Sequence, residues 1–538
     1  MAEPTTEEEA LALLVRLSDR LEARRFHLET LDRYYDGEHD LLFATERFRK
    51  AFGGLFREFA DNWCELVVDA VEERLSVTGF RVGDATEADA EAWRIWQANG
   101  LDAESQVGTT NALVHGAGYV MVGPDDDDER TPLITIEDAH EVIVDHDPAR
   151  RRRRRAALKR YRDEEEGREY ATLYTPSWIW RFQAPLGDTH PRRGGGSHAA
   201  WGDNQVQTMS RSQEVTWERR EIEGREWPEV NAYDEVMIVP LYNRPRGRRG
   251  KTDTWGVSEI GRMIPIQNAV NKLFLDMLVA GEFQGFPQRW ATGLLDDEED
   301  KKSGAEGGPT PFEQRVERFV AGASTMFTTE DTDTKFGQFP SADLGNFVQA
   351  IEMAVQHIAS QTRTPPHYFY LRGNMPSGES IKSAETGLVA KARRKMRHFG
   401  EGWEEVMRLA GKVAGINELA EATSMETMWA DPESRSEGQL VDSLVKKKDI
   451  GVPLRQLWED AGYSPEQIAR FEALRVQEGL LGGNSEQADS LARTLQQIYL
   501  AVPNVISTEE AREVAIEAGA DIDPEPPPGV GPAPRPGV

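Results

Sequence analysis

The stretch "SEIGRMIPIQNAVNKLFLDMLVAGEF", Ser258–Phe283, decides the fold prediction. Its apolar and amide side chains recur every three or four positions, which is the spacing of one face of an α-helix. This stripe contains Ile260, Ile264, Gln267, Asn271, Phe274 and Leu278. Pro265 lies inside the pattern and predicts either a kink or a late start of the helix. The sequence therefore predicts a long helix over residues 254–283.

A second long helix is predicted over residues 342–362. Its apolar stripe contains Leu344, Phe347, Ile351, Ala354 and Ile358. The chain between the two helices, residues 284–341, is polar and glycine-rich, as in "LLDDEEDKKSGAEGGP" at 294–309. Such a composition favours loops with short strands. The pattern is thus two long helices that bracket a small insertion.

A third long helix, predicted over residues 380–412, follows an aromatic and proline-rich loop. Pro365 and Pro366 end the preceding helix, and glycines in the loop allow the chain to reverse. The third helix has an apolar stripe from Leu388 to Trp403 and a dense basic run. The basic residues Lys391, Arg394, Lys395 and Arg397 lie mostly off that stripe. A solvated helix face is the favoured interpretation of this run, and contact with nucleic acid is the alternative.

The rest of the chain mixes helices and strands. Helices are predicted over residues 6–30, 58–76, 86–99 and 103–115, and shorter ones over 435–517. Between residues 117 and 242, β-branched and aromatic runs bounded by Gly, Pro and Asp predict strands that pack on the N-terminal helices. The tail "DPEPPPGVGPAPRPGV" is too rich in Pro and Gly to fold and is predicted to be disordered. The fold class is α+β and mainly helical.

Composition limits the function. The chain has 538 residues and a formal net charge of −30, so its surface repels nucleic acid over a Debye length of about 10 Å. Cys64 is the single cysteine and cannot form an intrachain disulfide. No segment offers the run of about 20 apolar residues that a membrane span needs. We expect a soluble protein that does not bind DNA tightly over its whole surface.

No motif predicts catalysis, a cofactor or a metal ion. "PRGRRGKT", Pro245–Thr252, ends like a phosphate-binding loop but has proline where that loop needs its first glycine. We therefore favour a basic surface loop. In "VDHDP", Asp145, His146 and Asp147 are adjacent on a strand and should point to opposite faces. Ser377 lacks the glycine pattern of a nucleophile elbow.

The run of six arginines, Arg150–Arg155, is the strongest local positive charge. We favour an exposed turn between strands, partly neutralised by the acidic residues Asp163–Glu166. Contact with phosphate, with another subunit or with a scaffold protein is the alternative.

The order of these segments resembles the portal proteins of long-tailed double-stranded DNA bacteriophages. The N-terminal likeness is carried by "LDRYYDGEHDL" and "NWCELVVDAVEERLSVTGFRV", and by "DPARRRRRRAALKRY" in the strand region. The stretch from "VPLYNRPRGRRGKTDTWGVSEIG" to "RWATG" resembles the entry into the family's stem. "TPPHYFYLRGNMPSGESIKSAETGL" resembles the turn after the second stem helix, and "MWADPESRSEGQLVDSLVKKKDIG" the start of the crown.

The resemblance implies a fold with a wing, a stem, a clip and a crown, which assembles as a ring. The expected parts are a wing at 1–253, stem helices at 254–283 and 342–362, a clip at 284–341, a tunnel loop at 363–379, a wing helix and connection at 380–434, a crown at 435–510 and a disordered tail at 511–538.

The resemblance also implies a function without catalysis. A ring of about twelve subunits at one capsid vertex would pass double-stranded DNA during packaging and ejection. The implied partners are the large terminase subunit, a head–tail adaptor, the major capsid protein and a scaffold protein, and the implied location is the virion, with assembly in the host cytoplasm.

The resemblance suggests three sets of contact residues. The candidates that face the channel are Pro365, Pro366, His367, Tyr368, Tyr370, Arg372 and Asn374. The basic helix adds Lys391, Arg394, Lys395 and Arg397, and the clip offers Asp296, Asp297, Glu298 and Glu299 to the terminase or adaptor.

Two alternatives remain at the level of sequence. A packaging enzyme, such as a terminase-like ATPase or nuclease, would need a phosphate-binding loop and clustered acidic metal ligands. Another minor capsid protein would lack two long helices around a small insertion.

Overall fold

The computed structural model describes residues 3–39, 61–83, 85, 88–128, 130–186, 215–245, 256–285, 289–292, 335–338, 343–369, 378–433 and 437–475. The chain divides into two compact units. Unit 1 holds residues 1–73, 104–122 and 134–402, and unit 2 holds residues 74–103, 123–133 and 403–538. The α+β class predicted from the sequence is confirmed.

Helix α1, Glu7–Tyr35, opens unit 1. Thr6 caps it by accepting a hydrogen bond from the Glu9 backbone N–H, and the Glu9 carboxylate accepts one from the Thr5 backbone N–H. Ala10, Leu14, Leu17 and Leu21 are buried and pack on the large sheet. These residues recur every three or four positions and so share one face of the helix.

The large sheet has strand order β4-β5-β6-β7-β8, and β9 also pairs with β7. Within the described residues, neighbouring strands of this sheet pair antiparallel. The strands are β4 Val142–His146, β5 Arg154–Asp163, β6 Arg168–Tyr174, β7 Trp178–Pro185, β8 Glu218–Arg219 and β9 Glu229–Val230. The alternation of side chains along β5 and β6 places Leu158, Ala171 and Leu173 against α1.

A smaller sheet in unit 1 has the order β10-β2-β3, with β2 Ala117–Gly123, β3 Leu133–Glu137 and β10 Ile238–Tyr242. Tyr119, Val236 and Ile238 share a second core with Val142 and Val144 of the large sheet. Helix α5, Leu101–His115, leads directly into β2. Helix α3, Trp63–Glu72, is shorter than the predicted 58–76.

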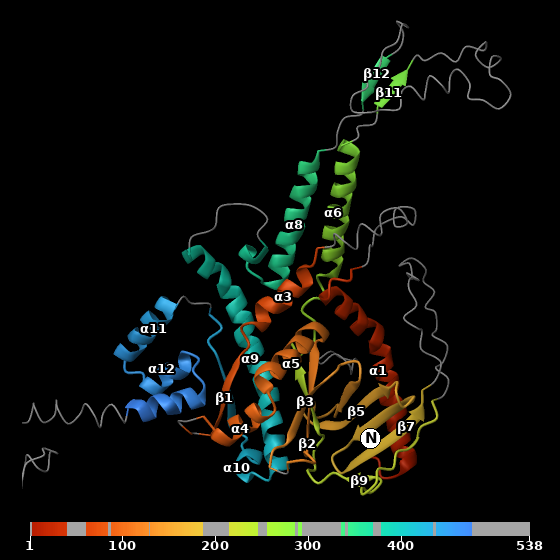
Figure 1. Cartoon of the computed structure of the whole chain (residues 1–538), viewed down its shortest axis with the longest axis vertical. Helices are drawn as coiled ribbons and strands as arrows, with labels where there is room; N and C mark the ends of the chain where they lie inside the picture. The colour runs from red at the N-terminus through yellow and green to blue at the C-terminus, as the bar shows by residue number, and fades with distance from the viewer. Residues whose placement is uncertain are drawn as a thin grey trace, which may run out of the picture. The chain divides into compact units, whose positions relative to one another are not determined.

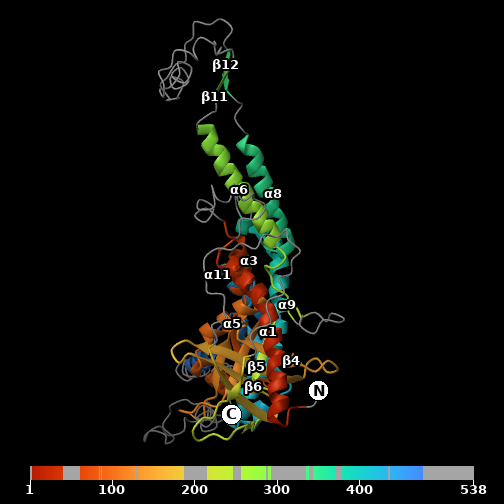
Figure 2. The ribbon, with the colours of Figure 1, turned by 90° about the vertical axis from the view of Figure 1, so that its right-hand side faces the viewer.

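Two long helices of unit 1 lie side by side and antiparallel, α6 Ile264–Gly285 and α8 Leu344–Thr362 (Figures 1 and 2). Helix α6 begins ten residues later than predicted, with Pro265 in its first turn, where proline needs no hydrogen-bonded N–H. Between them, β11 Arg289–Thr292 pairs with β12 Lys335–Gln338. The predicted pattern of two long helices around an insertion with short strands is confirmed.

Helix α9, Gly378–Ala414, runs from unit 1 into unit 2. In unit 2, β1 Val77–Val82 pairs with β13 Met425–Trp429. Trp96 of α4, Ala90–Ala98, lies edge-on to Trp403 of α9 with ring centroids 5.0 Å apart. Among the described residues of unit 2, the further helices are α10 Asn417–Ala420, α11 Glu437–Asp449, α12 Leu454–Asp460 and a helix over 465–475. Within the described ranges, no helix combines the length and the apolar character that a membrane crossing requires.

Candidate functional site

The first turns of α6 pack against the N-terminal end of α3. Gln267 accepts a hydrogen bond from the Trp63 backbone N–H at 3.1 Å and donates one to the Asp61 carbonyl at 2.7 Å. Asn271 accepts from the Asp61 backbone N–H at 3.0 Å. These amides lie on the apolar stripe of α6 because they satisfy backbone groups that the start of a helix leaves without intrahelical partners.

Helix α8 ends shortly before Pro365 and Pro366, as these two prolines predict. Arg363 adopts a left-handed conformation with φ of 59° and its N–H donates to the Ala359 carbonyl. The chain then forms a short 3-10 helix, η2, Pro366–Phe369. Phe369 is buried, and its ring centroid lies 5.4 Å from that of Trp63. The aromatic cluster therefore anchors the start of the loop to α3 of the same chain.

The candidates for the channel surface divide into three groups. Pro365 is buried within the chain, so the prediction that it faces DNA was wrong. Pro366 is exposed, and His367 and Tyr368 are half-buried, with the His367 ring 3.5 Å from Glu385. The other three, Tyr370, Arg372 and Asn374, lie outside the described residues, as do the clip residues Asp296, Asp297, Glu298 and Glu299.

Two lysines of α9 bind one buried glutamate at the base of the helix pair. Lys391 Nζ lies 2.9 Å from one carboxylate oxygen of Glu259, and Lys395 Nζ lies 2.6 Å from the other. The side chains of Lys391, Lys395 and Glu259 are 3%, 1% and 2% exposed. We call these three residues the lysine–glutamate junction.

The junction joins elements that are far apart in the sequence. Glu259 lies in the segment that leads into α6, and Lys391 also donates to the Thr362 carbonyl at the end of α8, at 2.9 Å. Lys395 donates to Asn243 Oδ1 at 2.5 Å, and Asn243 Nδ2 donates to Glu259 Oε1 at 3.1 Å. Helix α9 therefore ties the segment that precedes α6 to the end of α8.

Burial and charge act in opposite directions on the junction. Burial raises the pKa of Glu259, but the charges of Lys391 and Lys395 outweigh that effect and hold its pKa well below the usual range. Burial lowers the pKa of both lysines, that of Lys395 to about 8, although Glu259 partly offsets the loss. The carboxylate thus stays ionised at neutral pH.

This geometry corrects the expectation for the basic helix. Lys391 and Lys395 were predicted on a solvated face that could contact nucleic acid, and that prediction was wrong, since both are buried and bound to Glu259. Arg394 and Arg397 are exposed. Sequence reasoning missed Glu259 because a single carboxylate in "GVSEIG" carries no periodic signal.

The arginine run forms the predicted turn, but with a different acidic partner. Residues 150–153 are exposed in the turn between β4 and β5, whereas Arg154 is buried. Arg155 Nη2 lies 2.5 Å from Asp145, which also binds Arg20 at 2.7 Å. The prediction that Asp163–Glu166 neutralise the arginine run was therefore wrong for Arg155, whose partner is Asp145.

The "VDHDP" residues diverge as predicted from strand geometry. His146 lies 2.8 Å from the Tyr242 hydroxyl, on a different side from the Asp145–arginine cluster. Asp147 instead accepts hydrogen bonds from the Ala149 and Arg150 backbone N–H groups in the turn. Burial, with a contribution from the Arg154 charge, lowers the pKa of His146 from 6.5 to about 4.

The lowered pKa of His146 predicts a specific pH dependence of stability. Between pH 6.5 and about 4 the unfolded chain binds a proton at this position that the folded chain does not, so stability falls as pH falls through this window. His146→Asn lacks this titration. The difference in unfolding free energy between wild type and variant, measured by denaturant titration, should therefore shrink as pH falls. Parallel pH profiles of the two proteins would contradict the assignment.

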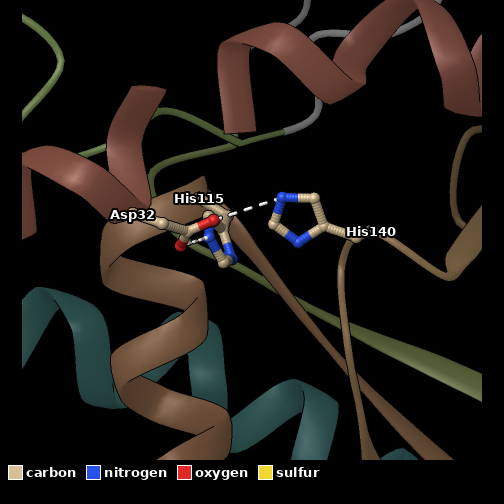
Figure 3. Close-up of side chains that lie close together, drawn as sticks. All are labelled: Asp32, His115 and His140. Carbon is tan, nitrogen blue, oxygen red and sulfur yellow. Dashed lines mark hydrogen bonds and ion pairs between the residues drawn. The ribbon is translucent and has the colours of Figure 1, made fainter. Parts of the chain in front are cut away.

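The fold also brings together a cluster that the sequence did not predict. We expected no metal site, yet Asp32, His115 and His140 place ligand atoms within 4.8 Å of one another (Figure 3). Hydrogen bonds that His140 donates to the Asp138 and Asp32 carboxylates raise the pKa of His140 to about 9. The three positions are separated by 83 and 25 residues of chain, so no spacing rule could have grouped them.

Comparison with known proteins decides the family. Residues 15–462 match the family model described as "Phage portal protein, SPP1 Gp6-like". This chain belongs to the phage portal protein family. The portal protein of Mycobacterium phage L5 is 31% identical over 432 residues, which cover 78% of this chain and 79% of the relative. The portal protein of Mycobacterium phage D29 is 32% identical over 423 residues, which cover 76% of this chain and 77% of the relative.

Membership in the portal family confirms the resemblance seen in the sequence. Portal proteins are structural components of the phage virion, and their family implies a ring at the capsid with phage packaging partners. In this portal-family chain, the long helices α6 and α8 bracket the insertion, and the lysine–glutamate junction fixes their bases.

Proposed function

We propose that copies of this chain assemble into a ring of about twelve subunits whose central channel passes double-stranded DNA during packaging and ejection. The antiparallel pair α6 and α8 is the observation that carries the proposal. A channel wall that carries a moving duplex has to be rigid. The buried junction supports that requirement, because it ties the start of α6 and the end of α8 to α9.

The family parts are proposed for this chain with the boundaries expected from its sequence. Residues 254–283 and 342–362 form the stem, residues 284–341 the clip, residues 363–379 the tunnel loop and residues 435–510 the crown. Residues 1–253 and 380–434 form the wing, and residues 511–538 are a disordered tail. The pairing of β11 with β12 supports a compact clip that closes on itself.

Loose contact with DNA follows from charge. The net charge of −30 repels phosphate, so a duplex inside the ring would slide without being held. Among the basic-helix candidates, the exposed Arg394 and Arg397 remain for transient phosphate contact. The tunnel-loop candidates Pro366, His367, Tyr368, Tyr370, Arg372 and Asn374 remain proposals for the surface that faces the duplex.

The proposed partners divide between the ends of the ring. The clip, with Asp296, Asp297, Glu298 and Glu299, would bind the large terminase subunit during packaging and a head–tail adaptor afterwards. The wing would meet the major capsid protein and the scaffold protein, during assembly in the host cytoplasm. ATP hydrolysis would belong to the terminase, since this chain has proline where a phosphate-binding loop needs its first glycine.

Electron microscopy of the purified full chain tests this proposal directly. Negative-stain images should show rings with a central hole, and the same preparation should lack ATPase activity above a buffer control. Class averages give the number of subunits. A monomer that hydrolyses ATP would overturn the proposal in favour of a packaging enzyme, and a compact particle without a hole would favour another minor capsid protein.

A further inference from the structure

We propose that Asp32, His115 and His140 form a binding site for one divalent transition-metal ion of the zinc class. This inference goes beyond the portal function and does not depend on it. The three ligands come from three elements of unit 1: the last turns of α1, the last residue of α5, and the loop between β3 and β4 (Figure 3).

The distances suit a small ion. His115 Nε2 lies 2.5 Å from Asp32 Oδ1, and His140 Nε2 lies 3.1 Å from Asp32 Oδ2. Ligands about 2.0–2.1 Å from a tetrahedral zinc ion stand about 3.3 Å from one another. All three ligand atoms already lie within 4.8 Å of one another, so small side-chain movements would complete the coordination.

A second carboxylate orients one of the imidazoles. Asp138 Oδ1 lies 2.9 Å from His140 Nδ1 and also accepts the His140 backbone N–H at 2.8 Å. This arrangement directs His140 Nε2 toward Asp32. Metal-bound histidines usually donate their other ring N–H to a carboxylate or carbonyl, which fixes the tautomer that binds the ion. The contact of Asp138 is therefore independent support for His140 as a ligand.

The donor set indicates the kind of ion. Two imidazole nitrogens and one carboxylate oxygen suit zinc and its neighbours better than calcium or magnesium, which prefer all-oxygen sites. The two rings stand edge to face with centroids 5.5 Å apart, so they approach the carboxylate from different directions. The Asp32 side chain is 34% exposed, which leaves room for water as a fourth ligand.

The ion would act as a structural clamp. His115 is followed by Gly116, whose carbonyl accepts the Asn243 backbone N–H at 2.9 Å. Asn243 in turn binds Glu259 and Lys395 of the junction. A metal ion at His115 would therefore fix α1, α5 and the β3–β4 loop beside the segment that leads into α6.

Calorimetric titration of ZnCl2 into the EDTA-treated full chain tests the site. We expect saturable binding of one ion per chain, accompanied by release of protons, because histidine must be deprotonated to bind a metal ion. His115→Gln and His140→Gln should each abolish that binding, and Asp138→Asn should weaken it about 10- to 100-fold. His357→Gln, an exposed histidine on α8, is the matched control and should leave binding unchanged.

Two further readouts keep the test decisive. Cobalt bound to the wild type should give visible absorption bands of a four-coordinate site, which His140→Gln removes. Circular dichroism reports whether each variant is folded. If a histidine variant does not fold, the loss of zinc affinity in Asp138→Asn provides the test instead. Absence of saturable zinc binding to the wild type would overturn the proposal, as would zinc affinity that the His115, His140 and Asp138 substitutions leave unchanged. Either result would leave the cluster as a metal-free hydrogen-bonded network.

Discussion

Glu259→Gln should lower the free energy of unfolding of unit 1 by about 3–5 kcal/mol, the usual cost of removing one partner from a buried ion pair. The variant leaves Lys391 and Lys395 buried without a carboxylate, at 3% and 1% exposure. Because Lys391 also binds the end of α8, hydrogen exchange in residues 344–362 should increase as well. Denaturant titration and exchange mass spectrometry measure the two effects.

An exposed ion pair provides the matched control. Arg152 and Glu401 lie 3.3 Å apart, but their side chains are 91% and 62% exposed. Glu401→Gln should therefore change stability by no more than about 1 kcal/mol. Equal effects of the two substitutions would show that burial of the junction contributes nothing.

Removal of all three junction charges separates charge from packing. Glu259→Leu combined with Lys391→Met and Lys395→Met removes the unpaired charge that makes the single substitution costly. We expect this triple variant to be more stable than Glu259→Gln, because apolar replacement of a complete buried ion cluster is often nearly neutral. A triple variant as unstable as Glu259→Gln would mean that shape, and not unpaired charge, causes the loss.

Gly256→Ala should have a second large effect, a loss of at least about 4 kcal/mol or failure to fold. A Cβ at position 256 would stand 1.7 Å from the Gly116 carbonyl oxygen, which is backbone and cannot rotate away. Gly116 itself has φ of 91° and would place a Cβ 2.9 Å from the Val257 nitrogen. Soluble yield and the denaturation midpoint measure the effect.

The control for Gly256 is a glycine in open space. Gly281 lies within α6, and a Cβ there meets nothing within 4 Å. Gly281→Ala should stabilise the helix by about 0.5–1 kcal/mol, because glycine is a poor residue for a helix interior. A Gly256→Ala protein as stable as the wild type would contradict the close approach of the α5–β2 turn to the chain that enters α6.

Both predictions concern how the long helices are held. Gly256 and Glu259 both lie in the short segment before α6. Gly256 contacts the Gly116 backbone, and Glu259 forms the buried ion pairs. Either substitution should therefore loosen the helix pair at its base without touching the helices themselves. In the proposed ring, that change would disturb the channel wall from the wing side.

The strand-rich part of the chain was predictable. Strands β2 to β10 all lie between residues 117 and 242, where β-branched and aromatic runs bounded by Gly, Pro and Asp predicted strands. Helix ends were less accurate: α6 begins at Ile264, ten residues after the predicted start. Periodicity identifies the buried face of a helix, but the first residue depends on which backbone groups find partners outside it.

Local sequence determined the two long helices, the short-stranded insertion between them and the proline-terminated end of α8, because periodicity and proline act through neighbouring residues. The tertiary structure alone placed Lys391 and Lys395 in the interior, since hydropathy assigns lysine to solvent unless a buried carboxylate is known to face it. It likewise decided the grouping of Asp32 with His115 and His140. These contacts join residues 25 to 136 positions apart, and no local pattern encodes which distant side chains will meet.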